Sequence, residues 1–86
     1  MARVLTLKRT VVPKSERKRY LERLRLRRDY YKRAGCTFWV FEEAGLVGAF
    51  IEFTEAQDAG TLSDAHANAP EAVFDSDRIY KEVEIG

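Results

Sequence analysis

Residues 37–54, TFWVFEEAGLVGAFIEFT, form the most apolar segment of the chain and contain the only tryptophan and four of the five phenylalanines. Aromatic and β-branched residues dominate 37–42 and 46–53, which is typical of strands. The residues between them include a glycine that can adopt positive φ. The segment therefore predicts a β-hairpin with Ala44 and Gly45 as its loop, and in that register Trp39 stands opposite Phe50.

Side chains alternate across a strand, so this register sorts the hairpin residues onto two faces. One face contains Phe38, Val40, Val47, Ala49, Ile51 and Phe53, and the other contains Trp39, Phe41, Leu46, Gly48, Phe50 and Glu52. Both faces are apolar, whereas an antiparallel sheet with one wet side alternates apolar and polar residues. Each face needs a cover, and we expect the helices of the chain on one face and a partner or ligand on the other.

Two further strands and two helices are predicted around the hairpin from the spacing of apolar residues. The predicted elements are a strand at 3–9, a helix at 15–34, the hairpin, a helix at 55–68, a loop at 68–78 with a short turn at 72–74, and a strand at 79–85. Ser15 is the expected N-cap of the first helix, and Gly35 is its expected C′ residue. Tyr20 and Tyr31 belong to the apolar stripe of that helix, which indicates that both are core residues.

The order β-α-β-β-α-β predicts an α+β, ferredoxin-like fold, in which a four-stranded antiparallel sheet carries both helices on one face. A single domain over residues 1–86 is expected at this length. The open face is expected to carry Trp39, Phe41, Leu46 and Phe50, together with Val4, Thr6, Lys8, Glu52, Tyr80, Glu82 and Glu84. On this assignment, Lys8 and Glu52 are a candidate ion pair across an interface.

The composition is ordinary for a soluble protein, with 45% hydrophobic and 34% charged residues. No apolar run approaches the roughly 20 residues that span a bilayer, and no signal peptide is recognisable, so we expect a cytoplasmic protein. The lone Cys36 excludes a disulfide within the chain. Residues 1–43 carry 13 Lys and Arg against 5 Asp and Glu, and residues 44–86 carry 2 against 9. This separation of a basic half from an acidic half favours self-association or an anionic partner.

A resemblance to a known superfamily begins at Gly48. The stretch GAFIEFTE at 48–55, followed by Leu62, Ala65-His66 and Pro70, resembles the strand and helix of the dimeric α+β barrel proteins, which include antibiotic-biosynthesis monooxygenase-like and NIPSNAP-like families. The resemblance implies a homodimer through the open sheet faces and a cavity between sheet and helices in each protomer. It also implies either binding of a small aromatic or apolar molecule or a cofactor-independent monooxygenase-like activity.

His66 is the candidate catalytic residue, because histidine is the side chain whose ordinary pKa lies near neutrality. The candidate residues for a ligand pocket or an interface are Trp39, Phe41, Phe50, Tyr80, Tyr31 and Phe38. Of these, Trp39 and Tyr80 could stack on or hydrogen-bond a planar ligand, but interface packing is the favoured interpretation for Trp39. No cluster with metal-ligand spacing is present, so no metal or other cofactor is expected.

Two other functions stay open at this point. A homodimer without enzymatic activity would use the open face only for interaction. RNA binding could use that face or the helix at 15–34, because residues 14–33 hold ten of the fifteen basic residues. The RNA-recognition motif requires aromatic residues on its first strand, and Val4-Leu5-Thr6-Leu7 contains none, so we do not expect a nucleic-acid partner.

Overall fold

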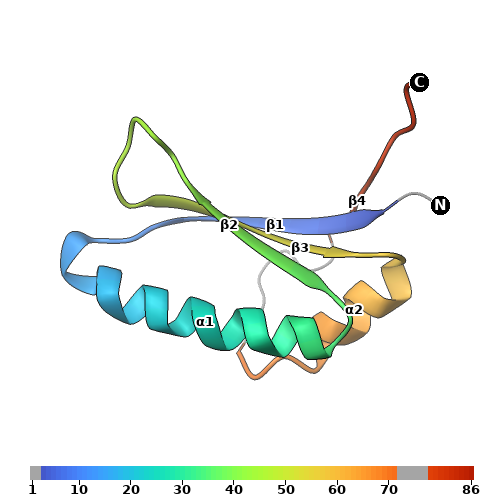
Figure 1. The fold of residues 1–86 in the computed structure, drawn as a ribbon, viewed down its shortest axis with the longest axis horizontal. Helices are drawn as coiled ribbons and strands as arrows, with labels where there is room; N and C mark the ends of the chain where they lie inside the picture. The colour runs from blue at the N-terminus through green and yellow to red at the C-terminus, as the bar shows by residue number, and fades with distance from the viewer. Residues whose placement is uncertain (1–2, 72–77) are drawn as a thin grey trace.

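The computed structural model describes residues 3–71 and 78–86. Its elements are β1 (Val4–Val11), a 3-10 turn (Lys14–Glu16), α1 (Arg17–Arg33), β2 (Thr37–Glu42), β3 (Ala49–Ala56), α2 (Ala59–Ala67) and β4 (Tyr80–Lys81). The strands form one antiparallel sheet in the order β2-β3-β1-β4, and both helices lie beneath the same face (Figure 1). The predicted α+β class is confirmed, and this architecture is compatible with a ferredoxin-like fold. The predicted turn at 72–74 lies outside the described residues.

The first helix ends as predicted but begins differently. Ser15 does not cap it, because the helix starts after the 3-10 turn with Glu16 as an N-cap that makes no side-chain hydrogen bond. At the other end, Gly35 has a φ of +83°, and the amides of Gly35 and Cys36 donate to the carbonyls of Lys32 and Tyr31. These two bonds are a Schellman motif, so the predicted C′ glycine is confirmed.

The second helix is shorter than predicted. The side chain of Asp58 accepts a hydrogen bond of 2.8 Å from the Thr61 amide, which starts α2 at Ala59. Glu55 and Ala56, which were predicted in this helix, instead complete β3. The predicted final strand is also shorter, since only Tyr80 and Lys81 pair with β1. Neither described helix is long and apolar enough to cross a lipid bilayer.

The bounds predicted for β2 are confirmed, but the predicted hairpin register is wrong by three residues. Phe53, rather than Phe50, stands opposite Trp39. The reason is the length of the connection, because residues 43–48 separate β2 from β3 where a two-residue loop was expected. Strand 3 therefore begins at Ala49 and not at residue 46.

Three contacts hold this longer connection. The Glu42 carboxylate accepts the Gly48 amide at 2.8 Å and the Arg17 guanidinium at 2.7 and 2.9 Å. These hydrogen bonds, first that of Arg17 and then that of Gly48, lower the pKa of the Glu42 carboxyl to about 2. The Val12 amide in turn donates to the Gly48 carbonyl at 2.8 Å. Gly48 has a φ of +93°, and a Cβ there would lie 2.6 Å from the Val12 carbonyl oxygen, so this position requires glycine.

A register shift by an odd number of residues moves each side chain of β3 to the other face. Ile51 and Phe53 were predicted beneath the sheet, but Phe53 shares the open face with Trp39, and Ile51 lies there opposite Phe41. Phe50 and Glu52 were predicted on the open face, but they lie against the helices and are each 5% exposed.

The face assigned to β1 was also wrong. Val4 and Thr6 stand opposite Ala56 and Thr54, and all four side chains are buried on the helix-covered face. Leu5 and Leu7 alternate with them and therefore lie on the open face. Lys8 is indeed opposite Glu52, but on the helix-covered face, so the expected ion pair across an interface is not formed there.

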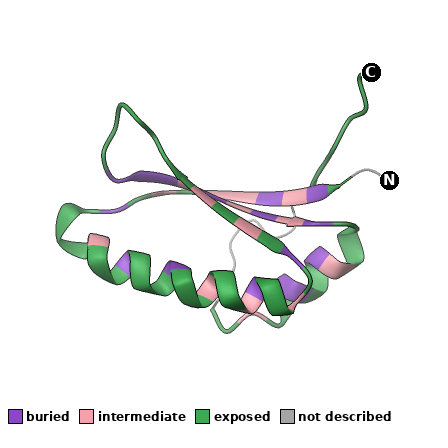
Figure 2. Cartoon of the chain, in the orientation of Figure 1, coloured by how far each residue is buried: buried purple, intermediate pink, exposed green. Residues whose placement is uncertain are grey.

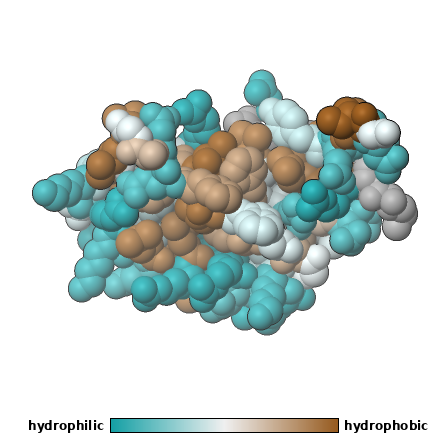
Figure 3. All heavy atoms as spheres, turned by 45° about the horizontal axis from the view of Figure 1, so that its top comes forward, coloured by the Kyte–Doolittle hydropathy of each residue, from teal (hydrophilic) through white to brown (hydrophobic). Residues whose placement is uncertain are grey.

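The open face is nevertheless apolar. Its apolar side chains are Leu5, Leu7 and Val11 of β1, Trp39 and Phe41 of β2, Ile51 and Phe53 of β3, and Tyr80 of β4. Trp39, Phe41 and Tyr80 are 46%, 54% and 48% exposed, as predicted for this face. Figure 3, turned to bring this side forward, shows the apolar side chains gathered over the middle of the sheet.

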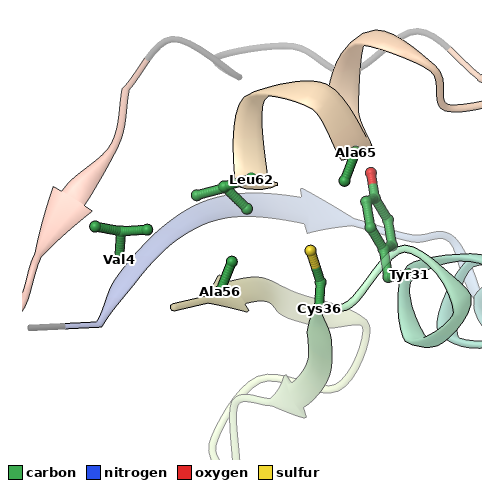
Figure 4. Close-up of a cluster of buried hydrophobic side chains, with 6 residues drawn as sticks. All are labelled: Val4, Tyr31, Cys36, Ala56, Leu62 and Ala65. Carbon is green, nitrogen blue, oxygen red and sulfur yellow. The ribbon is translucent and has the colours of Figure 1, made fainter. Parts of the chain in front are cut away.

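The helix-covered face contains two buried apolar clusters. The first joins Val4, Tyr31, Cys36, Ala56, Leu62 and Ala65, and in Figure 4 the Tyr31 ring lies beside Ala65 of α2. The second joins Val12, Tyr20, Leu24 and Phe50 beneath the other end of the sheet. Tyr20 and Tyr31 are therefore core residues, as predicted. Figure 2 shows most of the surface of α1 exposed, with buried positions recurring at intervals along it.

Candidate functional site

A cavity of about 80 Å³ lies between the helix-covered face of the sheet and both helices. Its walls come from the middle of β1, from β2 and β3, from the second half of α1, and from the end of α2 with the residues that follow it. Ordinary ligand pockets enclose roughly 300–1,000 Å³. This cavity is therefore small, and a ligand with a single ring would extend from its interior into its opening.

His66 lies in the last turn of α2 and lines this cavity. Its Nε2 is 2.7 Å from the Thr6 hydroxyl, and its Nδ1 is 2.9 Å from the Tyr31 hydroxyl. Each hydroxyl can donate or accept, so one ring nitrogen carries the proton and the other accepts from a hydroxyl. The imidazole thereby joins β1, α1 and α2. The His66 side chain is buried, at 8% exposure.

Burial also determines the charge of these groups. It lowers the pKa of His66, because the imidazolium would lose its solvation. Burial is likewise the main cause that raises the pKa of Tyr31 to about 12. Both side chains are therefore neutral at neutral pH, and the imidazole is available as a proton acceptor.

Aromatic packing holds Tyr31 in place. Its ring stacks on Phe38 of β2 with centroids 5.5 Å apart, and it meets the edge of His66 at 5.4 Å. The neighbouring Tyr30 donates its hydroxyl to the Ala65 carbonyl at 2.6 Å, which ties α1 to α2. The Tyr31 ring is thus held between Phe38 and His66, which fixes the position of its hydroxyl as a binding group requires.

A carboxylate forms the other polar wall of the cavity. Glu52 of β3 accepts the Tyr20 hydroxyl at 2.9 Å and the Arg27 guanidinium at 2.6 Å. The side chains of Glu52 and Arg27 are only 5% and 15% exposed. A buried carboxylate is stable only when it is paired and hydrogen-bonded, and both conditions are met here.

Arg27 binds a second carboxylate at the opening of the cavity. Its Nη2 and Nε lie 2.6 and 3.2 Å from Oε2 of Glu71, which follows α2 and is 45% exposed. Arg23 approaches the other Glu71 oxygen at 3.8 Å, and Lys8 adds positive charge nearby. The hydrogen bond from Arg27 is the main cause that lowers the pKa of Glu71.

The residues predicted for the site fall into three places. His66, Tyr31 and Phe38 line the cavity. Trp39, Phe41 and Tyr80 lie on the open face, on the other side of the sheet. Phe50 was expected in a pocket or interface and belongs to neither, because the register shift buries it with Tyr20, which it meets at 4.8 Å between ring centroids.

A second hollow lies on the open face beneath the hairpin connection. It measures about 410 Å³ and is lined mainly by apolar side chains, among them Val11, Phe41, Leu46 and Ile51. It is larger than the first cavity, but it is more open and receives no buried polar group. We therefore place the candidate small-molecule site at the cavity beneath the sheet, where His66 and Arg27 converge.

Four site residues were not predicted from the sequence: Thr6, Glu52, Arg27 and Glu71. Arg27 was counted only among the ten basic residues of 14–33, yet it follows Tyr20 by seven positions and precedes Tyr31 by four. That spacing places it on the buried stripe of the helix, and it was the available signal. Glu71 gave no such signal, because it belongs to no regular element.

Among residues 3–71 and 78–86, no group of three or more histidine, cysteine or acidic side chains is arranged to hold a metal ion. No protein-family model matches the chain, and no significantly similar curated protein or solved structure was found.

Proposed function

We propose that this protein is a homodimer of ferredoxin-like protomers, of the dimeric α+β barrel type, and that each protomer binds a small planar molecule in the cavity between its sheet and helices. The observation that carries the proposal is the buried His66, whose imidazole and hydroxyl partners face a cavity. Small-molecule sites typically combine apolar walls with a few convergent polar groups. Phe38 and Tyr31 supply the walls here, and Thr6, His66 and Arg27 supply the polar groups.

The apolar open face supports the proposed assembly. Contiguous exposed apolar patches of this kind mark interaction sites, and a two-fold axis brings such a patch against itself without any further complementarity. Strands of eight, six, eight and two residues cover about 400 Å² in plan, against about 800 Å² per partner in a typical stable interface. The hairpin connection and the residues after β4 rise on the same side and can supply the remaining area (Figure 1).

The binding proposal is tested with phenol as a small planar probe. Titration of ¹⁵N-labelled protein should move the amide signals of Thr6, Tyr31, His66 and Ala69. Tyr31→Phe removes one hydroxyl from the cavity and should weaken phenol binding about fivefold, the value of one neutral hydrogen bond. Tyr80→Phe removes a hydroxyl from the open face and should leave the affinity unchanged. Equal effects of the two substitutions, or signal changes that avoid the cavity, would contradict the proposal.

Catalysis by His66 is a second candidate function, favoured by the neutral state of the buried imidazole. Both ring nitrogens are already bonded, so a proton from a ligand would reach His66 through the hydroxyl of Thr6 or Tyr31. A cofactor-independent monooxygenase-like reaction needs such an acceptor for a phenolic proton. Oxygen uptake with hydroquinone, whose single ring suits the small cavity, above the rate of autoxidation and lost in His66→Gln while phenol still binds, would support catalysis. Equal rates in both proteins would leave binding as the function.

A further inference from the structure

The exposed carboxylate of Glu71 occupies a place that a ligand could take. Three cationic side chains, those of Arg27, Arg23 and Lys8, surround it at the opening of the cavity, and all four residues line the cavity. Glu71 is the one acidic residue among these four. Its side chain is 45% exposed, and it lies on a segment outside helix and strand. The Glu71 side of this ion pair is open to solvent, so a competing anion can reach Arg27 and replace the carboxylate.

Arg27 is held differently from Glu71. Its Nη1 is fixed at 2.6 Å by the buried Glu52, while the Nε and Nη2 edge points to Glu71. That edge is the part of a guanidinium that receives a carboxylate through two parallel hydrogen bonds. Because Glu52 keeps the guanidinium in place, the edge stays in position when Glu71 leaves. The receiving group is thus preorganised, and only its present occupant is weakly held.

The charges around the opening also favour an anion. Arg27, Arg23 and Lys8 carry three positive charges, against the two carboxylates of Glu52 and Glu71. Displacement of Glu71 leaves an excess of two positive charges at the opening, which a ligand carboxylate would reduce again. Beyond this opening, the interior of the cavity is lined by the uncharged side chains of Tyr31 and His66.

We propose that the ligand is a small organic carboxylate, whose carboxylate displaces Glu71 from Arg27 and whose uncharged part enters the cavity toward Tyr31 and His66. This inference rests on the proposed function, and it names the chemical class of the ligand. Glu71 then acts as an internal competitor that holds the excess at one positive charge when no ligand is bound.

The test compares two pairs of probes that share shape and differ in charge: benzoate with benzamide, and isobutyrate with isobutyramide. Each is titrated into the full ¹⁵N-labelled chain, and dissociation constants are taken from the cavity amides. In the unaltered protein the carboxylates should bind more tightly than the amides, and only their affinity should fall as salt is raised.

Three variants then locate the charge effect. Glu71→Gln removes the competing carboxylate and should tighten benzoate binding about three- to tenfold, without affecting benzamide. Lys8→Gln should weaken benzoate binding about two- to fivefold. Glu22→Gln, on the exposed surface of α1, is the matched control and should change neither affinity.

The outcomes separate this inference from the proposed function. If the amides bind the cavity as tightly as the carboxylates and Glu71→Gln changes nothing, the anion site is wrong while the small-molecule pocket stands. If benzoate moves only amides on the exposed surface of α1, the anion is bound by the basic helix and the inference is overturned. If no probe moves the cavity amides in either the unaltered protein or Glu71→Gln, both proposals fail.

Discussion

Arg27 and Glu52 form a 2.6 Å ion pair that joins the middle of α1 to the helix-covered face of β3, with side chains only 15% and 5% exposed. Attraction between two buried charges roughly offsets the cost of their desolvation, so the pair itself adds little stability. Removing Arg27 is costly all the same, because Glu52 would then be a buried charge without an ion-pair partner.

Arg27→Met is therefore expected to lower the free energy of unfolding by about 3–5 kcal/mol, measured by urea denaturation at neutral pH. Arg25→Met, on the exposed side of the same helix, should change it by less than about 0.5 kcal/mol. Adding Glu52→Gln to Arg27→Met removes the stranded charge and should restore most of the loss. A double variant as unstable as Arg27→Met alone would contradict the assignment.

The buried imidazole predicts a pH dependence of stability. Burial lowers the pKa of His66 in the folded state below its value in the unfolded chain, so the unfolded chain binds more protons as the pH falls below about 6.5. Stability should accordingly be full above that pH and should decrease as the pH drops toward the folded-state pKa. Urea denaturation at pH 7.5, 6.5 and 5.5 measures this loss.

His66→Gln provides the control for that experiment, since His66 is the only histidine. Glutamine cannot titrate, yet it can still donate to and accept from the Thr6 and Tyr31 hydroxyls. Between pH 5.5 and 7.5 the variant should lose most of the pH dependence. An unchanged pH profile in the variant would show that another group is responsible.

Gly48 is expected to be the least replaceable glycine of the hairpin connection. Gly48→Ala would force a non-glycine residue to a φ of +93° and bring its Cβ to 2.6 Å from the Val12 carbonyl oxygen. A loss of about 1–3 kcal/mol in unfolding free energy follows from the strain. At Gly45 an added Cβ meets nothing within 4 Å, so Gly45→Ala should leave the unfolding free energy nearly unchanged. Calorimetric unfolding of both variants and of the unaltered protein measures the two effects. Equal losses at the two glycines would contradict the hairpin geometry.

The sequence predicted the element types well and the side-chain faces poorly, and one cause explains most of the difference. The aromatic and β-branched residues of 37–42 identify β2, and Trp39 and Phe41 lie on the open face as expected. The register, however, depends on contacts between distant residues. Glu42 and Val12 hold Gly48 in the connection, and no local pattern around Ala44 and Gly45 reveals this.

The residues of the candidate site were also predicted only in part. His66 could be found by its chemistry, because it is the only side chain of its kind, and the structure places it beside Tyr31 and Phe38 in the cavity. Glu52 could not be assigned correctly, because the three-residue error put it on the wrong face. Arg27 could have been found from its helical spacing, had its charge not suggested a solvated position.

Trp39 reports on the open face, because it is the only tryptophan and is 46% exposed in the single chain. If a second copy covers this face, the emission maximum should shift to shorter wavelength as the protein concentration rises through the dissociation constant. Phe41→Glu places a charge beside the indole on the same strand and should keep the emission at long wavelength at all concentrations. An emission maximum in the unaltered protein that is independent of concentration and typical of an indole in water would contradict the prediction.

Sedimentation equilibrium tests most directly whether a second copy covers the open face. We predict a mass of two chains, about twice the 9.9 kDa of one, at micromolar concentration. Phe41→Glu should reduce that mass to one chain, and Leu21→Glu on the opposite layer should leave it at two. A mass of one folded chain for the unaltered protein at every concentration tested would contradict the proposed assembly.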